Sequence, residues 1–75
     1  MDEFKVLSHM TGTVVGINVK EGDKVGKDQE LLVLEAMKME MTVQAGRDGI
    51  VAQILVSEGD FVNEGDTVMV LKPES

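Results

Sequence analysis

The feature that most constrains this chain is an internal repeat with an offset of 37 positions. The segment at 12–34, "GTVVGINVKEGDKVGKDQELLVL", aligns without gaps with "GIVAQILVSEGDFVNEGDTVMVL" at 49–71, and ten aligned pairs are identical. A shorter match lies upstream, where Phe4 and Val6 align with Met41 and Val43. A repeat this dense predicts two similar units that pack on each other.

Both units have the residue pattern of β structure. Residues 30–36 and 67–72 are apolar runs rich in valine, which is typical of strands that are buried for much of their length. No window keeps a 3.6-residue period, so we expect no helix. Alternation along 12–19 and 49–56 predicts inward faces made of Val15, Ile17 and Val19 in the first unit and of Ala52, Ile54 and Val56 in the second.

Glycines mark the predicted turns. "EGD" occurs at 21–23 and again at 58–60, where the glycine is free to take a positive φ. Gly65 marks a further turn, and the repeat aligns it with Asp28. We therefore expect Asp28 and Gly65 to share a left-handed backbone conformation, which aspartate tolerates better than most residues.

The repeat and the turns together predict an all-β fold. We expect a single domain over 1–75, a flattened eight-stranded β-barrel or sandwich made of two four-stranded units related by a quasi-twofold axis. The tight hairpin at 36–39 is the counterpart of the two free termini, so its tip and the termini should lie at opposite ends. The expected strands span residues 2–7, 12–19, 24–26, 30–36, 39–45, 49–56, 61–63 and 67–72.

Composition excludes several classes of function. The chain has 75 residues, a net charge of −7, two phenylalanines and no tryptophan or tyrosine. We therefore expect neither nucleic acid nor an anionic membrane as a partner, since both attract basic surfaces and single strands also need aromatic stacking. There is no cysteine, and His9 is the only histidine, so no metal site is expected. Without a spanning apolar run or a signal peptide, we expect a cytoplasmic protein.

The stretch "EAMKME" at 35–40 is unusual for a hairpin tip, because Met37 and Met39 flank Lys38 where Asn, Gly or Asp is the common choice. One interpretation is an ordinary exposed lysine whose charge is offset by Glu35 and Glu40. That interpretation does not explain the methionines, whose flexible thioethers suit adaptable contacts. Either methionine could instead pack back on the barrel.

The stretch "EAMKM" resembles the biotin-attachment motif of biotin carboxyl carrier proteins and of the biotinyl domains of biotin-dependent carboxylases. The resemblance extends from about residue 5 to residue 71, because "GTVVGINVKEGDKV", "LLVLEAMKME" and "DGIVAQILVSEGDFV" fall where that family has its strands and turns. It implies that biotin protein ligase attaches biotin to Lys38. The residues implied in recognition by the ligase or another partner are Glu35, Ala36, Met37, Met39 and Glu40.

The resemblance also implies a carrier and not an enzyme, and the chain itself offers no catalytic constellation. The ε-amine of Lys38 would form an amide with biotin, and the cofactor would move CO2 from a biotin carboxylase site to a carboxyltransferase site. The parent enzyme would be a carboxylase such as acetyl-CoA, another acyl-CoA, or pyruvate carboxylase. The polar start after Met1, without an Ala/Pro linker, favours a free-standing carrier.

The chain departs from the family pattern at several loop positions, namely Ser8, His9, Ala45-Gly46, Asp28 and Met41. The segment between residues 20 and 30 is too short for the extra loop that some bacterial relatives carry beside the cofactor. Two alternatives remain open. One is a lipoyl carrier domain of a 2-oxo acid dehydrogenase complex, although such domains tend to have Asp-Lys-Ala at the tip. The other is an unmodified, hammerhead-like interaction module.

Overall fold

The computed structural model describes residues 3–74 and is built from strands and turns. Within these residues no helix is long and apolar enough to cross a membrane. The predicted all-β fold is confirmed, although β2 and β6 end two residues earlier than expected, and the expected start at residue 2 lies outside the described residues. The strands are β1 (Phe4–Leu7), β2 (Gly12–Ile17), β3 (Lys24–Val25), β4 (Glu30–Ala36), β5 (Met39–Gln44), β6 (Gly49–Ile54), β7 (Phe61–Val62) and β8 (Thr67–Lys72).

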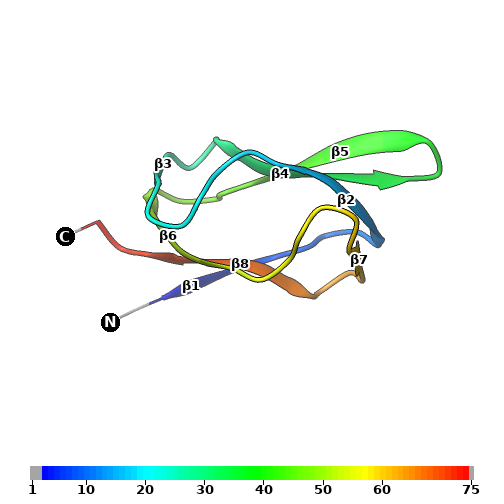
Figure 1. The fold of residues 1–75 in the computed structure, drawn as a ribbon. Coiled ribbons are helices and arrows are strands. Elements are labelled where there is room, and N and C mark those ends of the chain that lie inside the picture. The colour runs from blue at the N-terminus through cyan, green and yellow to red at the C-terminus, as the bar shows by residue number, and fades with distance from the viewer. Residues whose placement is uncertain (1–2, 75) are drawn as a thin grey trace.

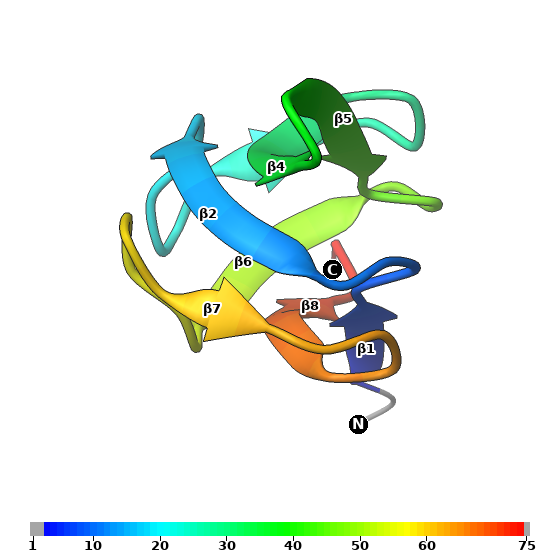
Figure 2. The same cartoon turned by 90° about the vertical axis from the view of Figure 1, so that its right-hand side faces the viewer.

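The eight strands form two four-stranded antiparallel sheets that pack face to face (Figures 1 and 2). One sheet has the order β1-β8-β6-β3 and the other β5-β4-β2-β7. Each sheet takes two strands from each repeat unit, so neither unit forms a sheet by itself. The 37-residue offset converts one strand order into the other, as the predicted quasi-twofold symmetry requires.

The symmetry extends to individual turns. The amide of Val14 donates to the Asp60 carbonyl at 2.8 Å, and the equivalent amide of Val51 donates to the Asp23 carbonyl at 2.8 Å. The two "EGD" glycines, Gly22 and Gly59, have φ values of 93° and 94°. Glycine adopts this left-handed conformation without steric cost, which explains why the same tripeptide occurs in both units.

The predicted inward face of β2 is wrong at Val15, which is 40 % exposed, whereas Val14 is 1 % exposed. The cause is a β-bulge: Val14 pairs with Leu34 and Gly16 with Val33, which leaves Val15 as an extra residue. A bulge reverses the alternation along a strand. Ile17 and Val19, which follow the bulge, point toward the core as expected.

The second unit has the same irregularity in β6. Val51 pairs with Leu71 and Gln53 with Val70, so Ala52 is the extra residue. Val51 is buried at 1 % exposure although the alternation placed it outside, and Ala52 is half-buried. Ile54 and Val56 pack against the core from its margin. The two bulges are therefore part of the repeat.

The expected equivalence of Asp28 and Gly65 is also wrong. Gly65 has a φ of 92°, but Asp28 is not in the left-handed region. The Gly65 amide donates to the Ser8 carbonyl, whereas in the first unit the Gly46 amide donates to the Lys27 carbonyl. Gly46 takes the positive φ there, at 82°. In one contact the left-handed glycine, Gly65, lies in the loop that is equivalent to the loop of Asp28. In the other contact the left-handed glycine, Gly46, lies in the loop that faces Asp28, so Asp28 carries no left-handed strain.

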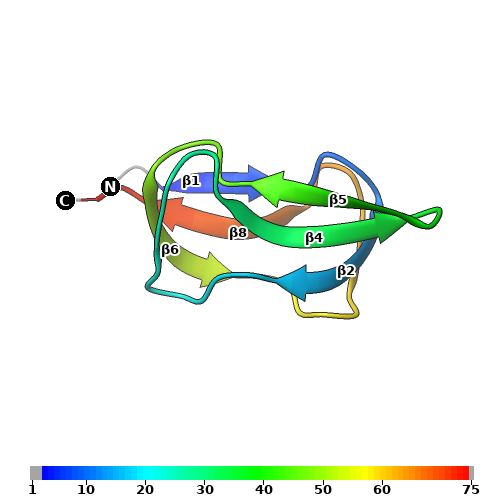
Figure 3. The same ribbon diagram turned by 90° about the horizontal axis from the view of Figure 1, so that it is seen from above.

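The core lies between the sheets and is almost entirely aliphatic. It extends through both halves, so the molecule is an elongated body of 40 × 17 × 17 Å. As predicted, the β4–β5 hairpin lies at one end and the two termini lie at the other (Figure 3). The core residues with no measurable exposure are Leu31, Leu32, Leu34, Val68, Met69 and Leu71.

Candidate functional site

The "EAMKME" stretch forms the β4–β5 hairpin. Ala36 pairs with Met39, which leaves Met37 and Lys38 as a two-residue turn. Both have positive φ, 54° and 66°, and they are the only such non-glycine residues among those described. This pattern is that of a type I′ turn, and each side chain held there costs about 1–2 kcal/mol relative to the right-handed region. The strain lies at the residue that the motif singles out.

The hairpin is fixed to the body by its inward residues. Leu34 of β4 and Val43 of β5 are buried at 0 and 2 % exposure, and they lie on the two strands that lead to and from the turn. Their burial sets the register that places residues 37–38 at the tip. The lysine is therefore presented at the tip of a paired hairpin whose strands are anchored in the core.

The methionines do not pack on the barrel. Met37 is 95 % exposed and Met39 is 65 % exposed, so the alternative in which either packs back on the core is wrong. Met41, two residues further along β5, is 41 % exposed. The tip thus presents Lys38 between two thioether side chains that are available to a partner.

The acidic residues of the motif flank the turn on the paired strands. Glu35 and Glu40 are opposite each other in the β4–β5 ladder and are both exposed. Among residues 3–74 the one ion pair joins Lys24 to Glu74, so neither glutamate holds the Lys38 amine. The Lys38 side chain is exposed at the tip, and no carboxylate of residues 3–74 pairs with its amine.

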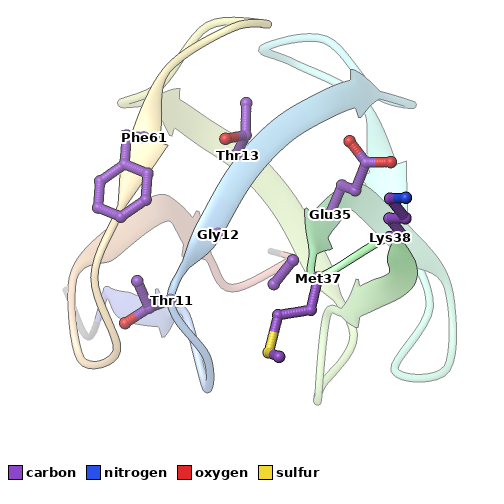
Figure 4. Close-up of a pocket in the computed structure, with 8 residues that line it drawn as sticks. Thr11, Gly12, Thr13, Glu35, Met37, Lys38 and Phe61 are labelled. Carbon is purple, nitrogen blue, oxygen red and sulfur yellow. The ribbon is translucent and has the colours of Figure 1, made fainter.

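A groove of about 580 Å³ lies beside the turn, between β2, the hairpin and Phe61 of β7. Figure 4 shows Phe61 on one side of β2, with Glu35, Met37 and Lys38 on the other. The lining residues that the motif does not include are Thr11, Gly12, Thr13 and Phe61. Sequence reasoning missed this groove, because its residues come from separate parts of the chain.

Gly12 is needed where β2 passes the hairpin. A Cβ on Gly12 would lie 2.7 Å from the backbone oxygen of Glu35. The repeat partner Gly49 has the same restriction, with its Cβ 2.7 Å from the oxygen of Lys72. The identity of these two glycines in the repeat was the available signal for a close approach of backbones.

No metal centre is present in the described part of the chain, where no three His, Asp or Glu side chains gather in a way that could hold an ion. His9 lies exposed in the β1–β2 loop. The hairpin itself presents an amine beside a partly apolar groove.

Comparison with known proteins identifies the family. A family model described as "Biotin-requiring enzyme" matches residues 5–71. The chain is 48 % identical over 62 residues to the biotin/lipoyl attachment protein of Bacillus subtilis (strain 168), covering 83 % of this chain and 85 % of that one. It is 42 % identical over 66 residues to the biotinylated protein TB7.3 homolog of Mycobacterium leprae (strain TN), covering 88 % and 93 %.

The fold agrees with a solved structure of a much larger enzyme. The Kluyveromyces lactis urea carboxylase superposes with a TM-score of 0.90 and 36 % identity. The match covers 96 % of this chain but only 6 % of the carboxylase chain, so the likeness concerns one domain of that enzyme. As the resemblance of "EAMKM" implied, the chain belongs to the biotin-attachment family of biotin-requiring enzymes.

Proposed function

We propose that this chain is a biotin carboxyl carrier that bears biotin covalently on Lys38. The observation that carries the proposal is the presentation of Lys38 at a strained two-residue turn, between exposed methionines, in a chain that belongs to the biotin-attachment family. The residues present fit the group, because the amine is exposed and no carboxylate of residues 3–74 pairs with it. An amine in this position can act as the nucleophile toward an activated carboxyl group.

The contribution of the chain is to hold and aim the amine. Positive φ at Met37 and Lys38 and the buried residues of β4 and β5 fix the direction in which the lysine leaves the barrel. When bound, biotin supplies a ureido ring that takes up CO2 and releases it to an acceptor. A short tether keeps the group at an effective concentration of about 1 mM near a docked active site.

The partners follow from the carrier role. The family and the similarity to a carboxylase support a biotin-dependent carboxylase as the assembly. Within it we propose that the biotinyl group visits two active sites, a biotin carboxylase site and a carboxyltransferase site. Biotin protein ligase would act on the exposed tip in the cytoplasm. We assign its recognition, or that of the carboxylase sites, to Glu35, Ala36, Met37, Met39 and Glu40.

The test is modification in vitro. The chain is incubated with biotin, ATP and biotin protein ligase, and the product is followed by intact-mass spectrometry and streptavidin blotting. We expect a single biotinyl group on the wild type and on Lys27→Arg, a matched exposed lysine, and none on Lys38→Arg. Arginine keeps the positive charge, but its guanidinium stays protonated and does not attack.

Two results would overturn the proposal. Label on Lys38→Arg would place the site elsewhere, and an unlabelled wild type would remove the biotin function. The name of the Bacillus subtilis relative covers lipoyl attachment as well. A parallel incubation with lipoate and lipoate ligase therefore tests the lipoyl alternative. Transfer of lipoate without transfer of biotin is the result that supports this alternative.

A further inference from the structure

One of the differences between the two ends of the barrel concerns a pair of positions that interact at one end. At the end near the termini, Lys24 of β3 and Glu74 form an ion pair with 3.6 Å between Nζ and Oε1. The 37-residue offset maps Lys24 onto Phe61 and Glu74 onto Met37. The strand positions of Lys24 and Phe61 are equivalent, because Lys24 pairs with Ile50 in the ladder and Phe61 pairs with Thr13. The backbone differs at the other pair, since Met37 has a positive φ in the hairpin turn and Glu74 does not.

The two pairs of positions hold side chains of different chemistry. Near the termini they neutralise each other. At the lysine end they are an aromatic ring and a thioether, 65 % and 95 % exposed, on either side of the groove beside Lys38 (Figure 4). Within the described residues nothing covers this apolar pair, although each side chain could be polar without harm to the fold.

The groove also carries a small polar set. Thr13 lies on β2 between Phe61 and Glu35 in the cross-strand row, and both Thr13 and Glu35 line the groove. The Thr11 hydroxyl oxygen accepts a hydrogen bond from the Glu64 amide at 3.1 Å, which leaves its proton free to donate. A groove with apolar walls, a hydroxyl donor and a carboxylate acceptor suits a neutral cyclic urea, which offers one carbonyl and two N–H groups.

The charge on Lys38 decides what can enter. As an ammonium, the side chain stays in water, because an apolar wall provides no partner for its charge. Acylation converts the ammonium into a neutral amide and lengthens the arm. Lys38 itself lines the groove, so any group on its amine remains tethered beside it.

We propose that the biotinyl group on Lys38 docks in the groove between Phe61 and Met37 when no partner holds it. The inference rests on the proposed function and adds a resting site for the cofactor on the carrier itself. Tethering makes a weak site sufficient: with an effective concentration of about 1 mM, an intrinsic Kd of the same size gives half occupancy. A carboxylase site must then compete with the groove for the arm.

The experiment compares the unmodified and the ligase-biotinylated chain by NMR, after intact-mass spectrometry has established that one biotinyl group is present. The chain has two phenylalanines, so the Phe61 ring signals are readily separated from those of Phe4, whose ring lies 4.2 Å from the Arg47 guanidinium carbon. We expect nuclear Overhauser contacts from the bicyclic ring protons of biotin to Phe61, and amide shifts at Thr11 and Thr13. The Phe4 ring should not shift.

The variants use the chain's own symmetry. Phe61→Lys installs the residue found at the equivalent position 24, on an exposed site, and should abolish the contacts and restore free tumbling of the ring in relaxation measurements. Lys24→Phe is the matched control and should leave the contacts unchanged.

Shifts confined to residues 36–39 report attachment alone and would overturn the proposal. If the ring stays mobile while Phe61→Lys slows transfer by the ligase, the groove binds the ligase and the proposal is wrong. If the mass measurement shows no biotin on the chain, the proposed function is wrong. This result is distinct from the results above, in which biotin is attached but does not dock in the groove.

Discussion

Alanine at Gly12 should destabilise the fold by direct contact with the strand that leads into the lysine hairpin. The added Cβ would lie 2.7 Å from the backbone oxygen and 3.3 Å from the backbone carbon of Glu35. Both atoms belong to the main chain of β4, so no side-chain rotation can relieve the contact, and β2 and β4 must move apart. Overpacking of this kind costs about 1–3 kcal/mol.

The repeat provides a second copy of the same experiment. Gly49→Ala places its Cβ 2.7 Å from the Lys72 oxygen and should cost a similar amount. Gly16→Ala is the control, because Gly16 lies on the same strand as Gly12 but has no positive φ, and a Cβ added there would meet no atom within 4 Å. It should be neutral or stabilising by about 0.4–1 kcal/mol, since alanine reduces the entropy of the unfolded chain.

Urea denaturation followed by circular dichroism measures these changes, because the chain has no tryptophan or tyrosine for fluorescence. In a domain of this size each 1 kcal/mol lowers Tm by roughly 4–8 °C. The reasoning is refuted if Gly12→Ala and Gly49→Ala both unfold within about 0.5 kcal/mol of Gly16→Ala, which is the ordinary range of harmless surface changes. Only Gly12→Ala should also slow biotin transfer to Lys38, because only Gly12 contacts the strand that enters the hairpin.

Asp28→Gly should destabilise by about 0.4–1 kcal/mol in urea denaturation, because Asp28 has no left-handed strain to relieve and glycine adds unfolded-state entropy. Gly65→Ala, at a φ of 92°, should cost about 1 kcal/mol or more, and equal effects of the two changes would contradict the asymmetry of these turns. Met37→Leu and Met39→Leu should change the free energy of unfolding by about 0.5 kcal/mol or less while altering the rate of biotin transfer, and a larger loss of stability would show hidden core contacts. Met37→Asn should raise the free energy of unfolding, measured in urea, by about 1 kcal/mol, because asparagine tolerates the type I′ turn, and an unchanged midpoint would argue against strain at the tip.

The strand number, the turns and the position of the lysine were predictable because the repeat fixes them jointly. Two "EGD" turns at the same offset define equivalent corners, and the central hairpin must then take the place of the termini. The family was predictable from "EAMKM" in that context. The type I′ geometry of Met37 and Lys38 was not, since neither residue type favours positive φ.

The errors share one physical origin, which is pairing between strands that lie far apart in the chain. Whether Val15 points in or out depends on a bulge against β4, and periodicity within β2 contains no information about it. At the contact of the two loops the left-handed residue is Gly46, whose amide donates to the Lys27 carbonyl, and not Asp28. The residue type at position 28 cannot predict this backbone conformation, because the conformation depends on the contact between two loops.

The quasi-twofold axis also separates the requirements of the fold from those of function. Where equivalent positions hold the same residue, as at Gly12 and Gly49, the same backbone contact demands it at both ends. Phe61 and Lys24 have equivalent ladder partners, so the backbone accepts either side chain, and a barrel alone gives no reason for an exposed phenylalanine in place of an ion-paired lysine. The difference arises at the end that presents Lys38, which is why the groove beside it, and not the barrel, is where residues specific to the cofactor should be sought.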